Sequence, residues 1–317
     1  MDTPHRRPAT RAQGWAWLAL AVPLISLSAI LPKLAAQPGA STGFWRFAIA
    51  CALAIVLLRW MTGGRTAPGA TGSAPTGSAH AAAGARPAAR RSRGAAVVAG
   101  GAIGGDIVLW NEALLTVPAA EASLLGHTAP LWVGLLGWWL WGRRPHGAFW
   151  MACALIGAGL GLFVAHRLGD GAGDGVGLAG VAMCVAAGGL YGIYLLVAQI
   201  AREGMAAVPL MIVSQAVAAA LCGGVALALG APLAGFDAAT WGWLLAGGVT
   251  GLAGSIALLQ SMATLSAATV SIALVLQVPV AGAIAAWLFS ERLVGLQALG
   301  AAVMAAGVLL IYARPAR

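Results

Sequence analysis

Two charged side chains, Asp106 and Arg46, fall inside long apolar stretches of the sequence. In a lipid bilayer such a charge costs roughly 2.5–3.5 kcal/mol, so it needs a partner or a function. Asp106 is suited to bind a cationic group or to carry a coupling proton; alternatively, it caps a helix break or hydrogen-bonds a neighbour, since the glycines at 100, 101, 104 and 105 allow close helix approach. Arg46 is suited to face a carboxylate; alternatively, it forms a structural salt bridge with Glu112 or Glu121.

Further polar side chains accompany these two charges. Glu112 or Glu121 could face an amine, and His127 could relay a proton because imidazole titrates near neutral pH. Together with Arg46 they would line an outward vestibule suited to a zwitterion. For Glu121 a solvated helix start is the competing interpretation, and for His127 a simple hydrogen bond. The amides of Asn111 and Gln260 are candidates for substrate contacts or for interhelical hydrogen bonds.

Two tryptophans and two prolines complete the candidate site. Trp110 and Trp132 fall near the predicted midplane, where their rings could form cavity walls or simply pack. Pro130 and Pro279 free backbone carbonyls at midplane, which favours a hinge or gate, although proline is also tolerated in ordinary membrane helices.

The composition identifies the class of protein that must position these residues. Of 317 residues, 60% are apolar and only 9% are charged, and the mean hydropathy is +0.87. Soluble domains carry roughly a quarter charged residues, so a soluble globule is excluded. The formal charge of +9 does not indicate nucleic-acid binding, because the arginines cluster between apolar segments. We expect an all-α, polytopic membrane protein.

A membrane-spanning helix needs about 20 mostly apolar residues, and ten segments fit this requirement. They cover approximately residues 14–33, 40–60, 95–116, 119–140, 147–166, 176–199, 208–230, 240–263, 267–289 and 295–312.

Placing the N-terminus inside puts most Lys and Arg residues on the cytoplasmic side, which predicts an inner-membrane protein with both termini cytoplasmic. Residues 1–13 and 313–317 are then cytoplasmic tails. Residues 62–93, rich in Gly, Ala, Ser, Thr, Pro and Arg, are predicted to be a flexible cytoplasmic linker.

The chain also contains an internal repeat. At an offset of 149 residues, Asp106 falls on Ser255, Asn111 on Gln260 and Pro130 on Pro279. This divides the chain into a first half at 14–166, a loop at 167–175 and a second half at 176–312. Because each half has five helices, an odd number, the second must be inverted relative to the first. Inverted repeats are typical of transporters, in which the halves rock around a substrate held between them.

Motifs in both halves resemble the EamA-type members of the drug/metabolite transporter superfamily. The first copy runs from Asp106 through Pro130 to Gly142-Arg143-Arg144-Pro145, and the second runs from Leu265 through Pro279 to Ser290-Glu291-Arg292-Leu293. Phe44-Trp45-Arg46-Phe47 is similar to the segment that holds the family's helix-two arginine. The resemblance implies ten helices in two inverted repeats and export of small metabolites or drugs, without fixing the substrate.

Enzyme classes are not supported, because the sequence lacks a Walker loop, a dinucleotide fingerprint and an HExxH motif. We therefore expect a secondary transporter that exports amino-acid-like metabolites, with no cofactor and no bound metal. Its predicted partners are a small-molecule substrate, the lipid bilayer and a coupling proton, and homodimerisation is left open. The competing classes are a non-transporting membrane scaffold and an intramembrane enzyme.

Overall fold

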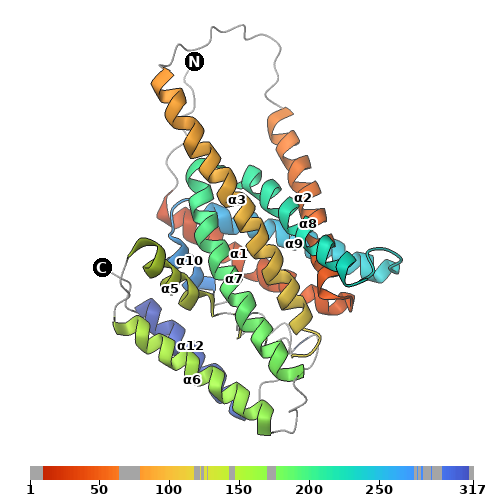
Figure 1. Cartoon of the computed structure of the whole chain (residues 1–317), viewed down its shortest axis with the longest axis vertical. Helices are drawn as coiled ribbons and strands as arrows, with labels where there is room; N and C mark the ends of the chain where they lie inside the picture. The colour runs from red at the N-terminus through yellow and green to blue at the C-terminus, as the bar shows by residue number, and fades with distance from the viewer. Residues whose placement is uncertain are drawn as a thin grey trace.

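The computed structural model describes residues 10–63, 79–117, 128–142, 147–169, 176–274 and 295–313, with single positions at 122, 125, 126, 277, 280 and 287. Every element in these residues is helical (Figure 1). The helices are α1 (Arg11–Ala35), α2 (Gly39–Gly63), α3 (Ala79–Ala113), α5 (Ala129–Trp141), α6 (Gly147–Gly169), α7 (Val176–Gly204), α8 (Ala207–Ala228), α9 (Ala238–Ser261), α10 (Ala267–Ala273) and α12 (Leu296–Ala313).

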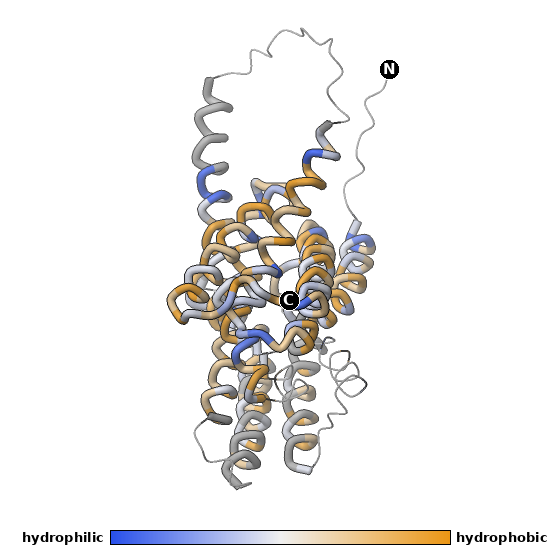
Figure 2. The backbone as a smooth tube through the Cα atoms, turned by 90° about the vertical axis from the view of Figure 1, so that its right-hand side faces the viewer, coloured by the Kyte–Doolittle hydropathy of each residue, from blue (hydrophilic) through white to orange (hydrophobic). Residues whose placement is uncertain are grey.

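The prediction of an all-α membrane protein is confirmed. Six helices within the described ranges are long and apolar enough to cross a membrane, and three shorter ones are also apolar. Each of the ten predicted segments contains a described helix, whereas ten complete spans stay a prediction. Apolar residues predominate along the helices in Figure 2, as expected where helix surfaces face lipid.

Local sequence explains where several helices begin and end. The Thr10 hydroxyl accepts a hydrogen bond from the Gln13 backbone N–H, while the Thr10 N–H donates to the Gln13 side chain, which forms a capping box at the start of α1. Asp237 accepts from the Thr240 N–H at 3.0 Å and caps α9. Gly142 ends α5 with a φ of 65°, a left-handed conformation that glycine adopts readily.

Helix α3 begins earlier than the sequence pattern predicted. It starts at Ala79 and so includes the second part of the 62–93 segment, which was expected to be flexible throughout. That part is rich in alanine and arginine, which are among the strongest helix formers, and it extends directly from an apolar helix. In Figure 1 this extension projects beyond the helix bundle.

The helices pack in pairs that join the two halves of the chain. Helix α3 packs on α7, and α1 packs on α9; α2 pairs with α8, and α6 with α12 (Figure 1). Small residues allow close approach: a Cβ on Gly100 would lie 2.6 Å from the Ser214 carbonyl oxygen, and one on Gly104 would lie 3.0 Å from the Ala218 Cα. Gly100 and Gly104 therefore allow α3 to pack closely against α8.

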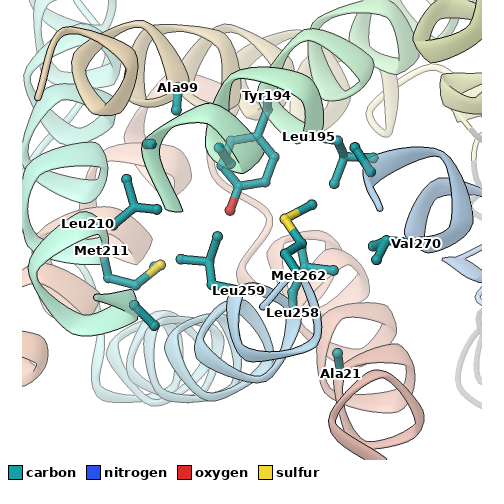
Figure 3. Close-up of a cluster of buried hydrophobic side chains, with 14 of the residues drawn as sticks. Ala21, Ala99, Tyr194, Leu195, Leu210, Met211, Leu258, Leu259, Met262 and Val270 are labelled. Carbon is teal, nitrogen blue, oxygen red and sulfur yellow. The ribbon is translucent and has the colours of Figure 1, made fainter. Parts of the chain in front are cut away.

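A buried apolar cluster occupies the place where α1, α3, α7, α8, α9 and α10 meet. Figure 3 shows Leu195, Leu210, Leu258, Leu259 and Met262 turned toward one another in this cluster. Its side chains come from both halves of the chain, so its burial holds the halves together. The cluster adjoins the cavity described next, because Tyr194 and Leu258 belong to the cluster and also line a chamber of that cavity.

Candidate binding cavity between the two halves

A cavity of about 80 Å³ lies between helices of the first and second halves. Helices α1, α2, α3 and α5 contribute to its wall from one side, and α7, α10 and the segment that follows α10 contribute from the other. Polar side chains are concentrated in this otherwise apolar wall: Ser26, Arg46, Asp106, Tyr191, Ser271 and Gln277.

Arg46 is held at the cavity by contacts on both sides of its position in α2. The preceding Trp45 donates a hydrogen bond from Nε1 to the Leu233 carbonyl oxygen at 2.9 Å and packs edge-on against Trp241, with ring centroids 4.7 Å apart. The guanidinium lies 5.8 Å from the centroid of the Phe47 ring. Only 8% of Arg46 is exposed, and its Nη1 has no hydrogen-bond partner in the part of the chain that the structure describes.

Asp106 reaches the same cavity from α3. The residue is buried, with 8% of its surface exposed, and it lines the cavity together with Arg46. Arg46 and Asp106 attract each other electrostatically across this space. A cation and an anion in one cavity can bind a ligand that carries both charges, and burial strengthens each interaction because screening by water is reduced.

A second, smaller chamber of about 20 Å³ shares Arg46 and Tyr191 with the main cavity. Gln215 of α8 and Ser255 of α9 add polar groups to its wall. Arg46 and Tyr191 therefore line both spaces, whereas Asp106 lines the main cavity and Gln215 lines the smaller chamber.

The structure brings four of the predicted site residues to the main cavity: Arg46, Asp106, Trp110 and Pro130. Trp110 is almost fully buried, and its ring covers Gly126, where a Cβ would clash with the ring. Trp110 thus lines the cavity and also belongs to a buried apolar cluster, so its contact with a substrate stays a prediction.

Asn111 and Glu112 follow Trp110 in α3, but their side chains contact the first residues of α2 instead of the cavity. The Asn111 side chain donates to Thr42 Oγ1 at 2.8 Å and to the Gly39 carbonyl oxygen at 3.3 Å. Glu112 is exposed and accepts a hydrogen bond from the Gly39 N–H at 3.4 Å. Among the described residues no ion pair joins Glu112 to Arg46, so the structural salt bridge considered from sequence is not formed with this glutamate.

The other predicted site residues lie away from the cavity or outside the described residues. Trp132 is 36% exposed and packs against Gly189 and Gly192 of α7, while Gln260 is half-buried near the end of α9. Neither lines the main cavity. The predictions for Glu121, His127 and Pro279 fall outside the described residues.

Several polar residues that line these spaces were not among the predicted site residues: Ser26, Tyr191, Gln215, Ser255, Ser271 and Gln277. A signal was present, since each is a polar or amphipathic side chain within an apolar helical segment, and intramembrane polar residues mark functional sites. In the described residues no group of three His, Cys, Asp or Glu side chains is placed to hold a metal ion.

Comparisons with known proteins agree with this architecture. A solved crystal structure is 18% identical to the chain and superposes with a TM-score of 0.60, covering 97% of this chain and 100% of that one. At this identity the likeness concerns the fold alone. No curated protein matches the chain. Residues 178–313 match the model of the EamA-like transporter family. This part of the chain therefore resembles the EamA-like transporter family, which belongs to the drug/metabolite transporter superfamily.

Proposed function

We propose that the protein is a secondary transporter that exports small amino-acid-like metabolites across the cytoplasmic membrane by alternating access. The match of residues 178–313 to the EamA-like transporter family supports a transporter of the drug/metabolite type in general. The observation that supports an amino-acid-like substrate is the position of Arg46 and Asp106, two buried and opposite charges that line one cavity. An α-amino acid carries a carboxylate for Arg46 and an ammonium group for Asp106.

The helix pairing supports two inverted halves, 14–166 and 176–312. In the order of the helices, α1 is the counterpart of α7, α2 of α8, α3 of α9 and α6 of α12. Exchanging counterparts turns the α3–α7 pair into the α9–α1 pair, and the structure forms both pairs. The α2–α8 and α6–α12 pairs map onto themselves, and all these contacts cross between the halves. Such an arrangement allows the halves to rock around the cavity, with Pro130 in the cavity wall as a candidate hinge.

The cost of burying charge supports transport over a purely structural role. A membrane scaffold has no use for an arginine and an aspartate in its interior, since apolar residues pack there without the cost of desolvation. An intramembrane enzyme would need a nucleophile, a metal or an acid–base pair in reacting geometry, whereas Arg46 and Asp106 form a pair suited to binding. The positive-inside distribution of arginines supports cytoplasmic termini.

The proposal is tested by uptake of radiolabelled leucine and phenylalanine into proteoliposomes preloaded with the same unlabelled amino acid. Arg46→Gln should abolish this exchange because the substrate carboxylate loses its counter-charge. Arg59→Gln is the matched control, since Arg59 lies on the same helix but is exposed. Equal exchange by Arg46→Gln and the wild type would contradict the proposal and favour the scaffold.

A further inference from the structure

We infer that Tyr191 and Gln277 are specificity-determining residues that bind the substrate's carboxylate together with Arg46. This inference rests on the proposed function and adds residues from the second half of the chain to the charged pair of the first half. Tyr191 belongs to α7, and Gln277 lies just beyond α10; both line the main cavity with Arg46 and Asp106.

The first argument is that three polar atoms at this cavity lack partners. The Tyr191 hydroxyl, Gln277 Nε2 and Arg46 Nη1 are all buried without a hydrogen bond to any group in the described residues. The Tyr191 hydroxyl and the Gln277 side chain lie near each other, at the margin of hydrogen bonding, but their distance and angles do not meet the criteria for a hydrogen bond. Leaving such groups unpaired is costly, so a ligand that pairs them gains affinity.

The second argument is that these three atoms match one chemical group. All three can donate hydrogen bonds, and a guanidinium and an amide N–H can do nothing else. A carboxylate offers about four acceptor positions on two oxygens, enough to accept from all three. Among these three atoms an ammonium group finds only one neutral acceptor, the Tyr191 hydroxyl oxygen, and it would bind the charged Asp106 instead, so the cavity distinguishes the two ends of an amino acid.

The third argument concerns the origin of the donors. Arg46 comes from the first half of the chain, whereas Tyr191 and Gln277 come from the second. A carboxylate bound to all three therefore bridges the halves that alternating access must move. The aspartate in the first half has a neutral counterpart, Ser255, in the second, so the second half contributes hydrogen bonds rather than charge.

The test compares ligands that keep or lack the carboxylate. The purified full-length protein is titrated with leucine, with leucinamide and with isopentylamine, which is leucine without its carboxylate. For the wild type we expect leucine to bind more tightly than isopentylamine. Tyr191→Phe and Gln277→Leu should each weaken leucine binding roughly tenfold or more, because each removes a hydrogen bond to a charged group. Binding of isopentylamine should stay unchanged, which also shows that the variants are folded.

Tyr194→Phe is the matched control. Tyr194 lies one turn further along α7 and stacks on Tyr191 with centroids 5.7 Å apart, but it lines only the smaller chamber. This variant should bind leucine as the wild type does.

Each remaining outcome has a distinct meaning. If Tyr191→Phe and Gln277→Leu bind leucine as the wild type does, water satisfies their polar atoms; this inference is then wrong while the proposed function stands. A wild type that binds isopentylamine but not leucine overturns the carboxylate site and leaves a transporter of cations. A wild type that binds none of the three ligands, or their phenylalanine equivalents, overturns the proposed substrate class as well.

Discussion

The guanidinium of Arg46 lies against Gly251 of α9: a Cβ on residue 251 would stand 3.1 Å from Arg46 Nε and 2.9 Å from Ser28 Oγ. The space beside residue 251 is thus occupied by the buried charge of a helix from the other half of the chain. A glycine at this point permits the arginine to reach the cavity, so the position of the charge depends on α9 as well as on α2.

Gly251→Ala should therefore weaken substrate binding. The added methyl group crowds Ser28 Oγ and the Arg46 guanidinium together, and a shift of the Arg46 side chain by a few tenths of an ångström misaligns its hydrogen bonds with a carboxylate. We expect leucine affinity to fall several-fold, since hydrogen bonds weaken steeply with poor geometry, and titration with leucine measures it. Gly247→Ala is the control, because a Cβ there meets its nearest neighbour, Leu31 Cβ, at 4.0 Å. Equal losses in both variants would show a general packing defect.

Asp106→Asn should lower affinity for isopentylamine and flatten the pH dependence of transport. The substitution keeps the size of the side chain but removes the charge that binds an ammonium group and the site that would carry a coupling proton. Arg46 and Tyr191 line the cavity with Asp106, and Cys222 of α8 interacts with it electrostatically; the ordinary pKa values of all three groups lie above the neutral range.

The measurement for Asp106 is leucine uptake driven by an imposed pH gradient in proteoliposomes. Glu112→Gln serves as the control, since Glu112 is an acidic residue of the same helix and its replacement retains an acceptor for the Gly39 N–H. Unchanged transport and unchanged pH dependence in Asp106→Asn would show that Asp106 neither binds the ammonium group nor carries a coupling proton.

Asn111→Leu should reduce stability and leave substrate affinity intact. The change removes the hydrogen bonds to Thr42 and Gly39, and interhelical hydrogen bonds in membranes contribute about 0.6 kcal/mol on average. The free energy of unfolding, measured by denaturant titration in detergent, should fall by about 1 kcal/mol. A loss of leucine binding at unchanged stability would instead identify Asn111 as a substrate contact.

The cap of α9 should weaken in acid. The Thr240 side chain and backbone N–H donate hydrogen bonds to Asp237, and they hold the pKa of that carboxyl below its usual value. A lowered pKa in the folded state means that the ionised carboxylate stabilises the fold above its unfolded pKa of about 3.9. This contribution is lost as the pH falls through the lower, folded pKa. The thermal midpoint of the wild type should therefore decline with acidification more than that of Asp237→Asn, which caps without titrating. Parallel pH profiles for the two proteins would contradict this account of the cap.

Much of the membrane architecture could be predicted from the chain itself. Length and hydropathy place the helices because a bilayer demands about 20 apolar residues per span, irrespective of what packs beside them. The same logic identified Arg46 and Asp106, since a charged residue within an apolar segment can be recognised from the sequence without knowledge of the fold. The early start of α3 at Ala79 was missed because the first part of this helix is too polar to be recognised as part of a membrane-spanning segment, although alanine and arginine favour a helix.

Tertiary structure alone decided which polar residues meet. Trp110 and Asn111 are adjacent in sequence, yet Trp110 lines the cavity and Asn111 binds the start of α2, because successive residues on a helix point about 100° apart. In a helix that is apolar all round, periodicity does not reveal which face meets the cavity, which meets another helix and which meets lipid. Packing of α3 against α7 and α8, and of α1 and α2 against α9, sets those rotations and brings Tyr191 and Gln277 to the charges of the first half.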